Sequence, residues 1–373
     1  MILVLHNRYR TTGGEERTVE DLLWLIRERL GEDAELLARD SATVGRAGAA
    51  AGLLGGGLRP DQVATAVRRT GARIVHAHNL HPTLGWRALQ AAREAGARVV
   101  LHLHQYRLVC AVGVCFTHGE ECTRCHGRNT LPGVLRNCRG SLAEAVTYGA
   151  ALALWQPRLA ELTDAFVVPS AFALERLHEL RAPVGQAHVL PHVIRRFAAG
   201  SAAAGGGHAL VVARLAPEKG VDIAIEACRI AGMPLVVAGD GPERERLAAA
   251  AGAGGADVTF AGRVDDRELE RLRRDAVMAI VPSRSGETFG LAAAEAMAAG
   301  VPVVASRVGA LPELVADQWL AAAGDPQALA GAIRRLREDA GAAGELAIER
   351  VRRLTNPDVV SKRLAEVYAA VDG

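Results

Sequence analysis

The sequence predicts an α/β protein built from two Rossmann-like domains with parallel sheets facing a central cleft. At 373 residues the chain is longer than one hydrophobic core usually serves, so two domains are expected. Short apolar segments alternate with amphipathic ones along both halves, which indicates parallel sheets covered by helices on both faces. Half of the residues are hydrophobic but only 14 are aromatic (six Phe, four Tyr, four Trp), so Ala, Val and Leu must fill the cores.

Composition excludes several classes of function. The net charge of +2 arises from 44 basic and 42 acidic residues, and this balance does not favour nucleic-acid binding. No apolar run approaches the ~20 residues that a membrane-spanning helix needs. The first ten residues, MILVLHNRYR, have no charged segment before their apolar part and read as a first strand rather than a signal peptide. We therefore expect a cytoplasmic protein, and nothing in the sequence indicates its oligomeric state.

The first half begins with an apolar strand at residues 2–6, and Gly13 and Gly14 precede a helix near 16–30. Backbone amides without hydrogen-bond partners at a helix N-terminus favour binding of an anion. A plain tight turn explains the two glycines equally well. Residues 45–57 are predicted to form a loop and a short helix. Further strands are expected near 34–38, 73–77, 98–103 and 165–169, and further helices near 60–70, 83–95 and 142–160.

Histidines follow two of these strands: His76, His78 and His81 after one, and His102 and His104 after the next. In an open α/β sheet, ligands bind beyond the carboxyl ends of the strands. A histidine there is often structural, and His104 is the functional candidate. His78 with Asn79 is a second, weaker candidate for an acceptor cleft.

Five of the six cysteines lie in one polar, Gly-rich stretch. Cys122 and Cys125 form a CxxC motif, which can place two thiolates on one tetrahedral metal, and Cys110 and Cys138 would complete a four-cysteine site. Such a segment cannot build its own core, so a structural zinc ion suits it. A disulfide or free thiols are the alternatives. Cys115 is spare, and His118 or His126 could replace a cysteine. Four thiolates leave no open position, so no catalysis is expected from this metal.

The second half begins after the segment 187–193 and a stretch of linker composition at 197–207. A strand at 208–213 ends at Arg214, and the helix start Pro217-Glu218-Lys219-Gly220 follows. An Arg and a Lys at a strand end and a helix start can clamp a diphosphate, and two solvated surface cations are the alternative. A strand that runs into a turn is expected at 234–241, further strands at 257–261 and 277–282, and helices near 326–338, 340–354 and 356–372.

The stretch 281–306 combines a strand end, a glycine-bearing loop, a helix and another strand. Gly286 and Gly290 predict that the helix begins only after Glu287, so that Glu287 lies in the loop and Glu295 inside the helix. Two carboxylates would then face one crevice at different depths. Two solvated glutamates on an ordinary strand–helix unit are the alternative.

These segments resemble the retaining glycosyltransferases of family 4, which have the GT-B fold. The resemblance rests on the E-x7-E segment from Glu287 to Glu295, the following G-x-P-V-V-A strand, and the R-x4-K-G setting of Arg214 and Lys219. The chain departs from the family pattern in two places. Gln105 replaces the aspartate that usually follows the strand-end histidine, and His192 replaces the usual asparagine of the hinge. A subset of the family carries a similar cysteine-rich insertion.

The resemblance implies an N-terminal acceptor-side domain at 1–192 with the insertion at 107–140, a C-terminal nucleotide-sugar-binding domain at 193–355, and a last helix at 356–373 that returns to the first domain. It places Arg214 and Lys219 on the diphosphate, Glu287 on sugar hydroxyls and Glu295 on the ribose. His104 would lie near the transferred sugar. The resemblance further implies donor contacts from Gly13, Gly14, Arg263, Val264, Thr288, Phe289, Gly290 and Leu291.

The expected function is transfer of a sugar, with retention, from a nucleoside-diphosphate sugar, favouring UDP, to a hydroxyl of a small molecule, lipid-linked intermediate or polysaccharide. No catalytic metal is expected, because the two cations take that role. Peripheral membrane contact is compatible with a lipid-linked acceptor. Two other classes remain: another GT-B enzyme, such as a nucleotide-sugar 2-epimerase, and a catalytically silent sugar-nucleotide binding protein.

Overall fold

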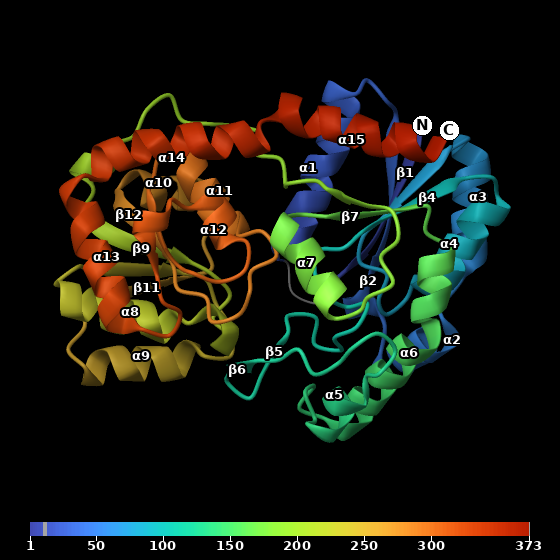
Figure 1. Ribbon diagram of the computed structural model, residues 1–373, viewed down its shortest axis with the longest axis horizontal. Coiled ribbons are helices and arrows are strands. Elements are labelled where there is room, and N and C mark those ends of the chain that lie inside the picture. Colours follow the sequence, from blue (N-terminus) through green and yellow to red (C-terminus); the bar gives the residue numbers. More distant parts are fainter. Residues whose placement is uncertain (10–12, 373) are drawn as a thin grey trace. The chain divides into compact units, whose positions relative to one another are not determined.

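The computed structural model describes residues 1–9 and 13–372, which form two compact units (Figure 1). Unit 1 comprises Met1–His118, Cys122–Val193 and Pro357–Gly373, and unit 2 comprises Gly119–Glu121 and Ile194–Asn356. Each unit contains a six-stranded parallel sheet with helices on both faces. The predicted α/β class with two Rossmann-like domains is therefore confirmed.

The sheet of unit 1 has the order β2-β1-β3-β4-β7-β8. Its strands are β1 (Ile2–Arg8), β2 (Ala34–Asp40), β3 (Ile74–Ala77), β4 (Arg98–His102), β7 (Ala165–Val168) and β8 (Ala187–Val189). Neighbouring strands pair in parallel along the sheet, with Val4 beside His76 and His76 beside Val100. The strand order reverses at β1: β2 lies on one side of β1, and β3, the next strand in the chain, lies on the other.

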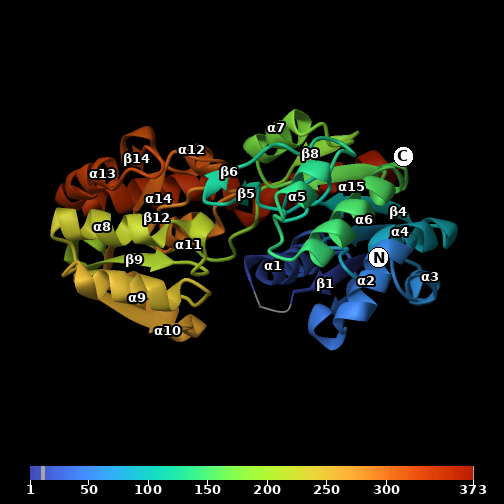
Figure 2. The same ribbon diagram turned by 90° about the horizontal axis from the view of Figure 1, so that it is seen from below.

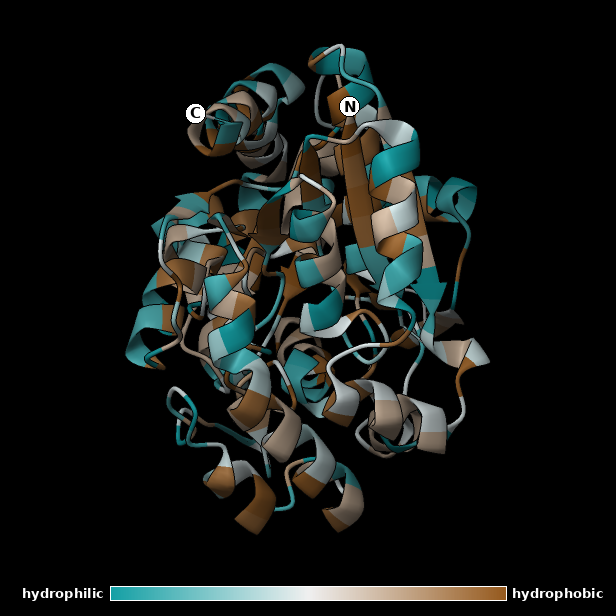
Figure 3. Ribbon diagram, turned by 90° about the vertical axis from the view of Figure 1, so that its right-hand side faces the viewer, coloured by the Kyte–Doolittle hydropathy of each residue, from teal (hydrophilic) through white to brown (hydrophobic). Residues whose placement is uncertain are grey.

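Helices enclose the sheet of unit 1 on both faces. One face packs under α1 (Gly14–Arg29) and α15 (Pro357–Asp372), with Val4, Ile74, Val100 and Val167 in that core. The other face packs under α3 (Pro60–Thr70), α4 (Gly85–Glu94), α6 (Leu142–Glu161) and α7 (Ala171–Glu179). Figure 3 shows the hydrophobic strands between helices that carry hydrophilic positions. Since successive residues of a strand point to opposite faces, the central strands carry apolar side chains on both faces.

The sheet of unit 2 has the order β11-β10-β9-β12-β13-β14. Its strands are β9 (His208–Val212), β10 (Leu235–Ala238), β11 (Val258–Gly262), β12 (Ala276–Val281), β13 (Val303–Ser306) and β14 (Leu320–Ala321). Numbered by their order within the unit, these strands run 3-2-1-4-5-6, which is the Rossmann arrangement. The order reverses between β9 and β12, and ligands bind such sheets beyond the strand ends at that point.

Two sets of helices cover the sheet of unit 2 (Figure 2). The first set is α8 (Val221–Ala231), α9 (Arg244–Ala253) and α13 (Pro326–Glu338). The second is α10 (Asp266–Arg274), α11 (Leu291–Ala298), α12 (Leu311–Leu314) and α14 (Ala340–Thr355). Short connections are η3 (Pro217–Lys219), η2 (Ala203–Gly205) and η4 (Asp317–Trp319).

Several segments differ from the sequence prediction. The short helix predicted within residues 45–57 is α2 (Arg46–Gly55), which takes up most of that stretch, and η1 (Ser41–Thr43) precedes it. The stretch 197–207 has linker composition, yet the Ser201 hydroxyl donates to the Gly300 carbonyl at 2.6 Å, so the stretch packs onto unit 2. The cysteine-rich segment contains the short strands β5 (Phe116–Thr117) and β6 (Glu120–Glu121) and the helix α5 (Leu131–Leu135).

Within the described residues, no helix has both the length and the apolar character that crossing a bilayer requires. Exposed apolar side chains gather instead on α5 and α6. Leu135 is 76% exposed, Leu131 58% and Leu142 63%, and these are large hydrophobic residues that folding normally covers.

Candidate functional site

In unit 2, the predicted donor-site residues lie at the point where the strand order reverses. Arg214 and Lys219 follow β9, and Glu287 follows β12, its sheet neighbour. The Lys219 ammonium donates to Glu287 Oε1 at 2.7 Å, and the Ser283 hydroxyl donates to the same oxygen at 2.6 Å. Burial alone would raise the pKa of Glu287, but the Lys219 charge and these two hydrogen bonds bring that pKa below its usual value. Glu287 is therefore a carboxylate.

Arg214 forms an ion pair with Glu218, and its side chain is 56% exposed. The two predicted cations therefore each pair with a different carboxylate, Arg214 with Glu218 and Lys219 with Glu287. Glu218 is itself buried, and its carbonyl accepts the backbone amide of Arg284 at 2.9 Å. The Arg284 guanidinium in turn donates two hydrogen bonds, of 2.7 and 2.8 Å, to the Asp222 carboxylate. The loop after β12 is thus tied to the start of α8.

Two glycines allow the backbone to approach closely around Glu287. Gly220 has φ 62°, and a Cβ there would lie 2.1 Å from the carbonyl oxygen of Pro282. Gly309 has φ 60°, and a Cβ there would lie 2.3 Å from the backbone nitrogen of Glu287. Ala310 then donates its amide to the Glu287 carbonyl at 2.8 Å. Only glycine combines this conformation with this contact, so both loops fix the position of Glu287.

Glu295 lies in α11, which begins at Leu291 after Gly290, as the sequence predicted. Its carboxylate pairs with Arg273 of α10 at 2.5 Å, and both side chains are largely buried, at 15% and 12% exposure. The sequence analysis missed Arg273, because 22 residues separate the partners and only the packing of α10 beside α11 joins them. The ion pair fixes the orientation of Glu295.

The remaining predicted donor contacts fall into three groups. Arg263 and Val264 follow β11, while Thr288, Phe289, Gly290 and Leu291 connect Glu287 to α11. Phe289 is only 4% exposed and packs in the hydrophobic core, so its backbone alone could face a ligand. Gly13 caps α1 in unit 1, and its amide donates to Glu16 Oε2 at 2.8 Å. Glu16 therefore occupies one of the amides that we expected to face a phosphate, and Gly14 begins the helix.

A second set of polar residues lines a pocket in unit 1, which we call the histidine pocket. It is lined by Tyr9, Glu15, His78, Asn79, Leu80, His81, Leu101, His102, Leu103, His104, Gln105, Arg107, Leu108 and Leu159. The pocket lies at the carboxyl ends of β1, β3 and β4, where this sheet also changes direction. His104 and His78 thus share one pocket. His78 Nδ1 lies 2.7 Å from His104 Nε2, and burial holds the pKa of both rings well below its usual value, so both are neutral.

Gln105, which stands where the resembled family usually has an aspartate, fits this pocket through its hydrogen bonds. Its amide donates to the Tyr9 hydroxyl at 2.9 Å and to Glu15 Oε2 at 3.3 Å, and the Tyr9 hydroxyl donates to Glu15 Oε2 at 2.9 Å. Burial raises the pKa of Glu15. An aspartate at 105 would set a second carboxylate against Glu15, whereas an amide stabilises it. Glu15 is a candidate functional residue that sequence reasoning missed, because its partner Gln105 lies 90 residues away in the chain.

The cysteine-rich segment forms a second pocket in unit 1, lined by Cys110, Cys115, Cys122, Cys125 and Cys138 together with neighbouring apolar residues. The Gly113 amide donates to Cys110 Sγ at 3.4 Å. The Cys115 thiol and nearby amides lower the pKa of Cys110 to about 6. His118 bonds the Arg136 carbonyl and His126 bonds the Arg124 carbonyl, and neither lines this pocket. The four predicted cysteines thus lie together, with the spare Cys115 beside them.

A family model matches part of the chain. Residues 200–353 match the family model described as "Glycosyl transferases group 1". That match spans most of unit 2, including Arg214, Lys219, Glu287 and Glu295. The first half of the chain lies outside it.

Among curated relatives, a GDP-mannose-dependent alpha-(1-6)-phosphatidylinositol dimannoside mannosyltransferase of Mycobacterium tuberculosis is 41% identical over 130 residues. The alignment covers 33% of this chain and 33% of the relative, so the chain spans about a third of that relative's length. A glycogen synthase of the same species is 34% identical over 229 residues, covering 56% of this chain and 54% of the relative.

Solved structures match over nearly the whole chain. Sucrose-phosphate synthase of Thermosynechococcus elongatus has a TM-score of 0.70 at 18% identity, covering 99% of this chain and 98% of the other. The Anabaena protein Alr3699/HepE, in complex with UDP and glucose, has a TM-score of 0.67 at 18% identity and covers 99% of both chains. At this identity the likeness shows the fold, and the fold is GT-B.

Proposed function

We propose that the protein is a retaining glycosyltransferase that moves a sugar from a nucleoside-diphosphate sugar to an acceptor hydroxyl. The observation that carries the proposal is the Lys219–Glu287 pair at the reversal point of a Rossmann sheet, within the segment that matches group 1 glycosyl transferases. Cleavage of the anomeric bond builds negative charge on the diphosphate and positive charge on the sugar. A site for this reaction needs a fixed cation beside a fixed carboxylate. The Lys219 ammonium and the Glu287 carboxylate meet these two needs.

Each residue has a role in this chemistry. Arg214 and Lys219 would stabilise the charge that develops on the leaving diphosphate, which is worth more in a water-excluded site than in bulk water. Glu287, fixed by Ser283 and Lys219, would accept hydrogen bonds from sugar hydroxyls and hold the ring in place. Glu295 would bind the ribose hydroxyls. By the family resemblance the acceptor attacks from the face that the diphosphate leaves, so the protein supplies no nucleophile.

UDP-linked sugars are the proposed donors. The Anabaena protein of the same fold is known with UDP and glucose, which supports this choice. The name of the mycobacterial relative specifies GDP-mannose, which makes GDP-mannose the competing donor. Calorimetric titration with UDP-glucose, UDP-N-acetylglucosamine and GDP-mannose separates these cases, because a base-specific pocket discriminates strongly between uracil and guanine. Preferential binding of GDP-mannose would overturn the UDP proposal and leave the transferase proposal intact.

Retention and the rival functions are tested on the product. Proton NMR of the glycoside should show the same anomeric configuration as the donor. A free nucleotide with an epimerised sugar would instead identify a nucleotide-sugar 2-epimerase. Tight UDP binding without transfer or hydrolysis would identify a silent binding protein.

A lipid-linked acceptor is favoured by the exposed leucines of α5 and α6, since a peripheral contact would cover them. Co-flotation with anionic vesicles should fall when Leu131 and Leu135 are replaced by Ser. Equal flotation of the variant and the native chain would exclude this surface.

We also propose a structural zinc ion in the cysteine pocket, bound by Cys110, Cys122, Cys125 and Cys138. The donor set fits zinc because thiolates are preferred ligands and the pocket brings all four residues together. Within the described chain, however, the groups of three or more ligand atoms that lie within 4.8 Å of one another are histidine groups. The cysteine loop would therefore draw closer around the ion. Cys115, as the spare thiol, would hydrogen-bond to a ligand sulfur.

A further inference from the structure

Histidines line one face of the unit 1 sheet along three neighbouring strands. His76 lies beside Val4 on β1 and beside Val100 on β4. Because alternate residues of a strand share a face, His6, His78 and His102 follow on that same face, one step nearer the carboxyl ends. This is the face under α1 and α15. Each of these side chains is at most 3% exposed.

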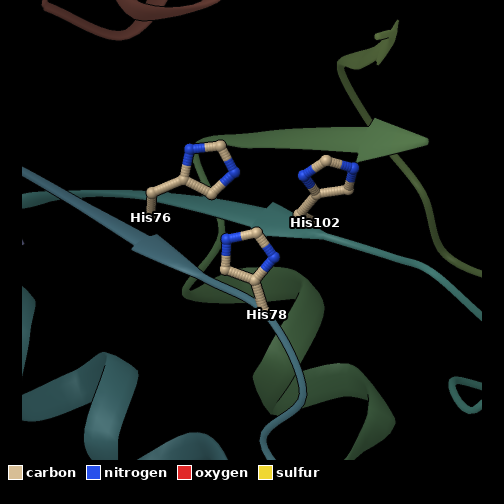
Figure 4. A group of neighbouring side chains, drawn as sticks. All are labelled: His76, His78 and His102. Atoms are coloured by element: carbon tan, nitrogen blue, oxygen red, sulfur yellow. The ribbon is translucent and has the colours of Figure 1, made fainter. Parts of the chain in front are cut away.

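Ring nitrogens of three of these histidines lie close together. His76 Nδ1 bonds the Tyr368 hydroxyl at 2.8 Å and His78 Nδ1 bonds His104 Nε2 at 2.7 Å. The Nε2 atoms of His76 and His78 and both ring nitrogens of His102 find no hydrogen-bond partner among the described residues. One nitrogen from each of the three rings lies within 4.8 Å of the others. Figure 4 shows the three rings grouped together, and the His76 and His78 rings are stacked with their centroids 4.9 Å apart.

Buried polar atoms without partners are costly, so this group calls for an explanation. Protonation does not supply one, because burial lowers the pKa of His76 to about 3 and that of His78 and His102 well below its usual value. Neutral imidazoles present lone pairs, and a metal ion is a partner that several neighbouring imidazoles can share.

We propose that His76, His78 and His102 form a binding site for a divalent transition-metal ion, with zinc favoured. Imidazole nitrogen suits zinc, copper, nickel and cobalt, whereas calcium and magnesium require oxygen ligands. Three protein ligands leave a fourth position for a water molecule. This site is separate from the cysteine pocket and does not depend on the proposed glycosyl transfer.

The surroundings of the triad resemble the outer shell of a metal site. Metal-bound histidines usually engage their second nitrogen, which fixes the ring's orientation. Tyr368 does this for His76 and His104 does it for His78. Glu15 lines the same pocket as His78 and His102.

The proposed site has a consequence for His104. If His78 binds the ion through Nε2, its proton must remain on Nδ1 and be donated to His104 Nε2. His104 would then carry its own proton on Nδ1. Metal binding would thereby fix one tautomer of His104, the histidine that we expect near the transferred sugar.

The test uses cobalt(II) as a spectroscopic probe on the full chain. A histidine site gives visible d–d absorption, and a cysteine site adds intense thiolate-to-cobalt absorption in the near ultraviolet. We expect the native chain to bind one equivalent of cobalt with histidine-type absorption, in addition to any thiolate-type signal. His102→Phe keeps a buried ring of similar shape and should abolish only the histidine-type signal.

His6→Phe is the matched control, since His6 lies in the same buried cluster but outside the triad. It should keep the histidine-type signal. Tyr368→Phe removes only the hydroxyl on His76 and should weaken cobalt affinity by about 10–100-fold, which tests the site even if His102→Phe does not fold. Absence of histidine-type absorption in the native chain would overturn the proposal. So would a native histidine-type signal in His102→Phe together with native cobalt affinity in Tyr368→Phe. The rings would then form a stack of neutral histidines, in which the ring centroids of His76 and His78 are 4.9 Å apart.

Discussion

At the scale of single residues, Lys219 is the most informative side chain in the molecule. The chain contains 44 basic residues, yet Lys219 and Lys362 are its only lysines. Lys219 lies at the strand-order reversal and binds Glu287, whereas Lys362 is exposed on α15. The lysine ammonium is a compact point charge, which suits a residue that we propose to face a phosphate oxygen.

Lys219→Ala should lower kcat by about 10²–10³-fold, because the ammonium acts on charge that grows as the bond breaks. Glu295→Ala should mainly raise the donor KM, since the ribose does not react and the contact stabilises ground state and transition state alike. Glu287→Ala should change both. Steady-state kinetics with one donor checks this pattern, with Lys362→Ala as the control that keeps native values. Native kcat and KM in both Lys219→Ala and Glu287→Ala would place the active site elsewhere.

His104→Ala should lower kcat by roughly 10²-fold, because a displaced group near the reacting centre typically costs this much. UDP affinity should be unchanged, since Arg214, Lys219 and Glu295, which we propose to hold the nucleotide, belong to unit 2. His178→Ala removes an exposed histidine of the same unit and should match the native chain. Loss of UDP binding in His104→Ala, with turnover of bound donor preserved, would refute this role.

At the scale of elements, the loops around Glu287 rely on close backbone approach. Gly309→Ala would place a methyl group 2.3 Å from the Glu287 nitrogen, so we expect a displaced carboxylate and a large loss of activity. Gly324→Ala is a matched control, because Gly324 has φ 78° but nothing within 4 Å of its Cβ position. Both variants carry about 1 kcal/mol of backbone strain, and only Gly309→Ala should lose activity at temperatures where both are folded. Equal kcat in the two variants would show that this contact does not position Glu287.

The cysteine segment is the element that we expect a metal to stabilise. The purified chain should contain about one zinc ion in the cysteine pocket, and Cys122→Ser should lower the melting temperature of unit 1 while leaving UDP affinity largely intact. Elemental analysis and thiol titration check this, and Cys228→Ser, in unit 2, is the control. Freely titrating thiols at all five positions in the native chain would contradict it.

At the scale of the whole molecule, the alternating apolar segments predicted the two sheets well. The expected strand at 73–77 is β3 (Ile74–Ala77), and the glycines around Glu287 correctly marked where α11 begins. Contacts between distant segments were not predictable in the same way. Gln105 meets Glu15 across 90 residues, and periodicity does not reveal which helix covers which strand end. The histidine alignment was accessible, because VHAHN and VLHLH carry histidines at the same spacing on adjacent strands.

The most direct test of the central claim is calorimetric titration of UDP into the native chain, the double variant Arg214→Ala/Lys219→Ala, and the control Lys362→Ala. The account predicts UDP binding to the native chain and to the control. Each charge-assisted contact is worth roughly 1.5–3 kcal/mol, so the double variant should bind about 100-fold more weakly or worse. Equal UDP affinity in the double variant and the native chain would contradict the proposed donor site.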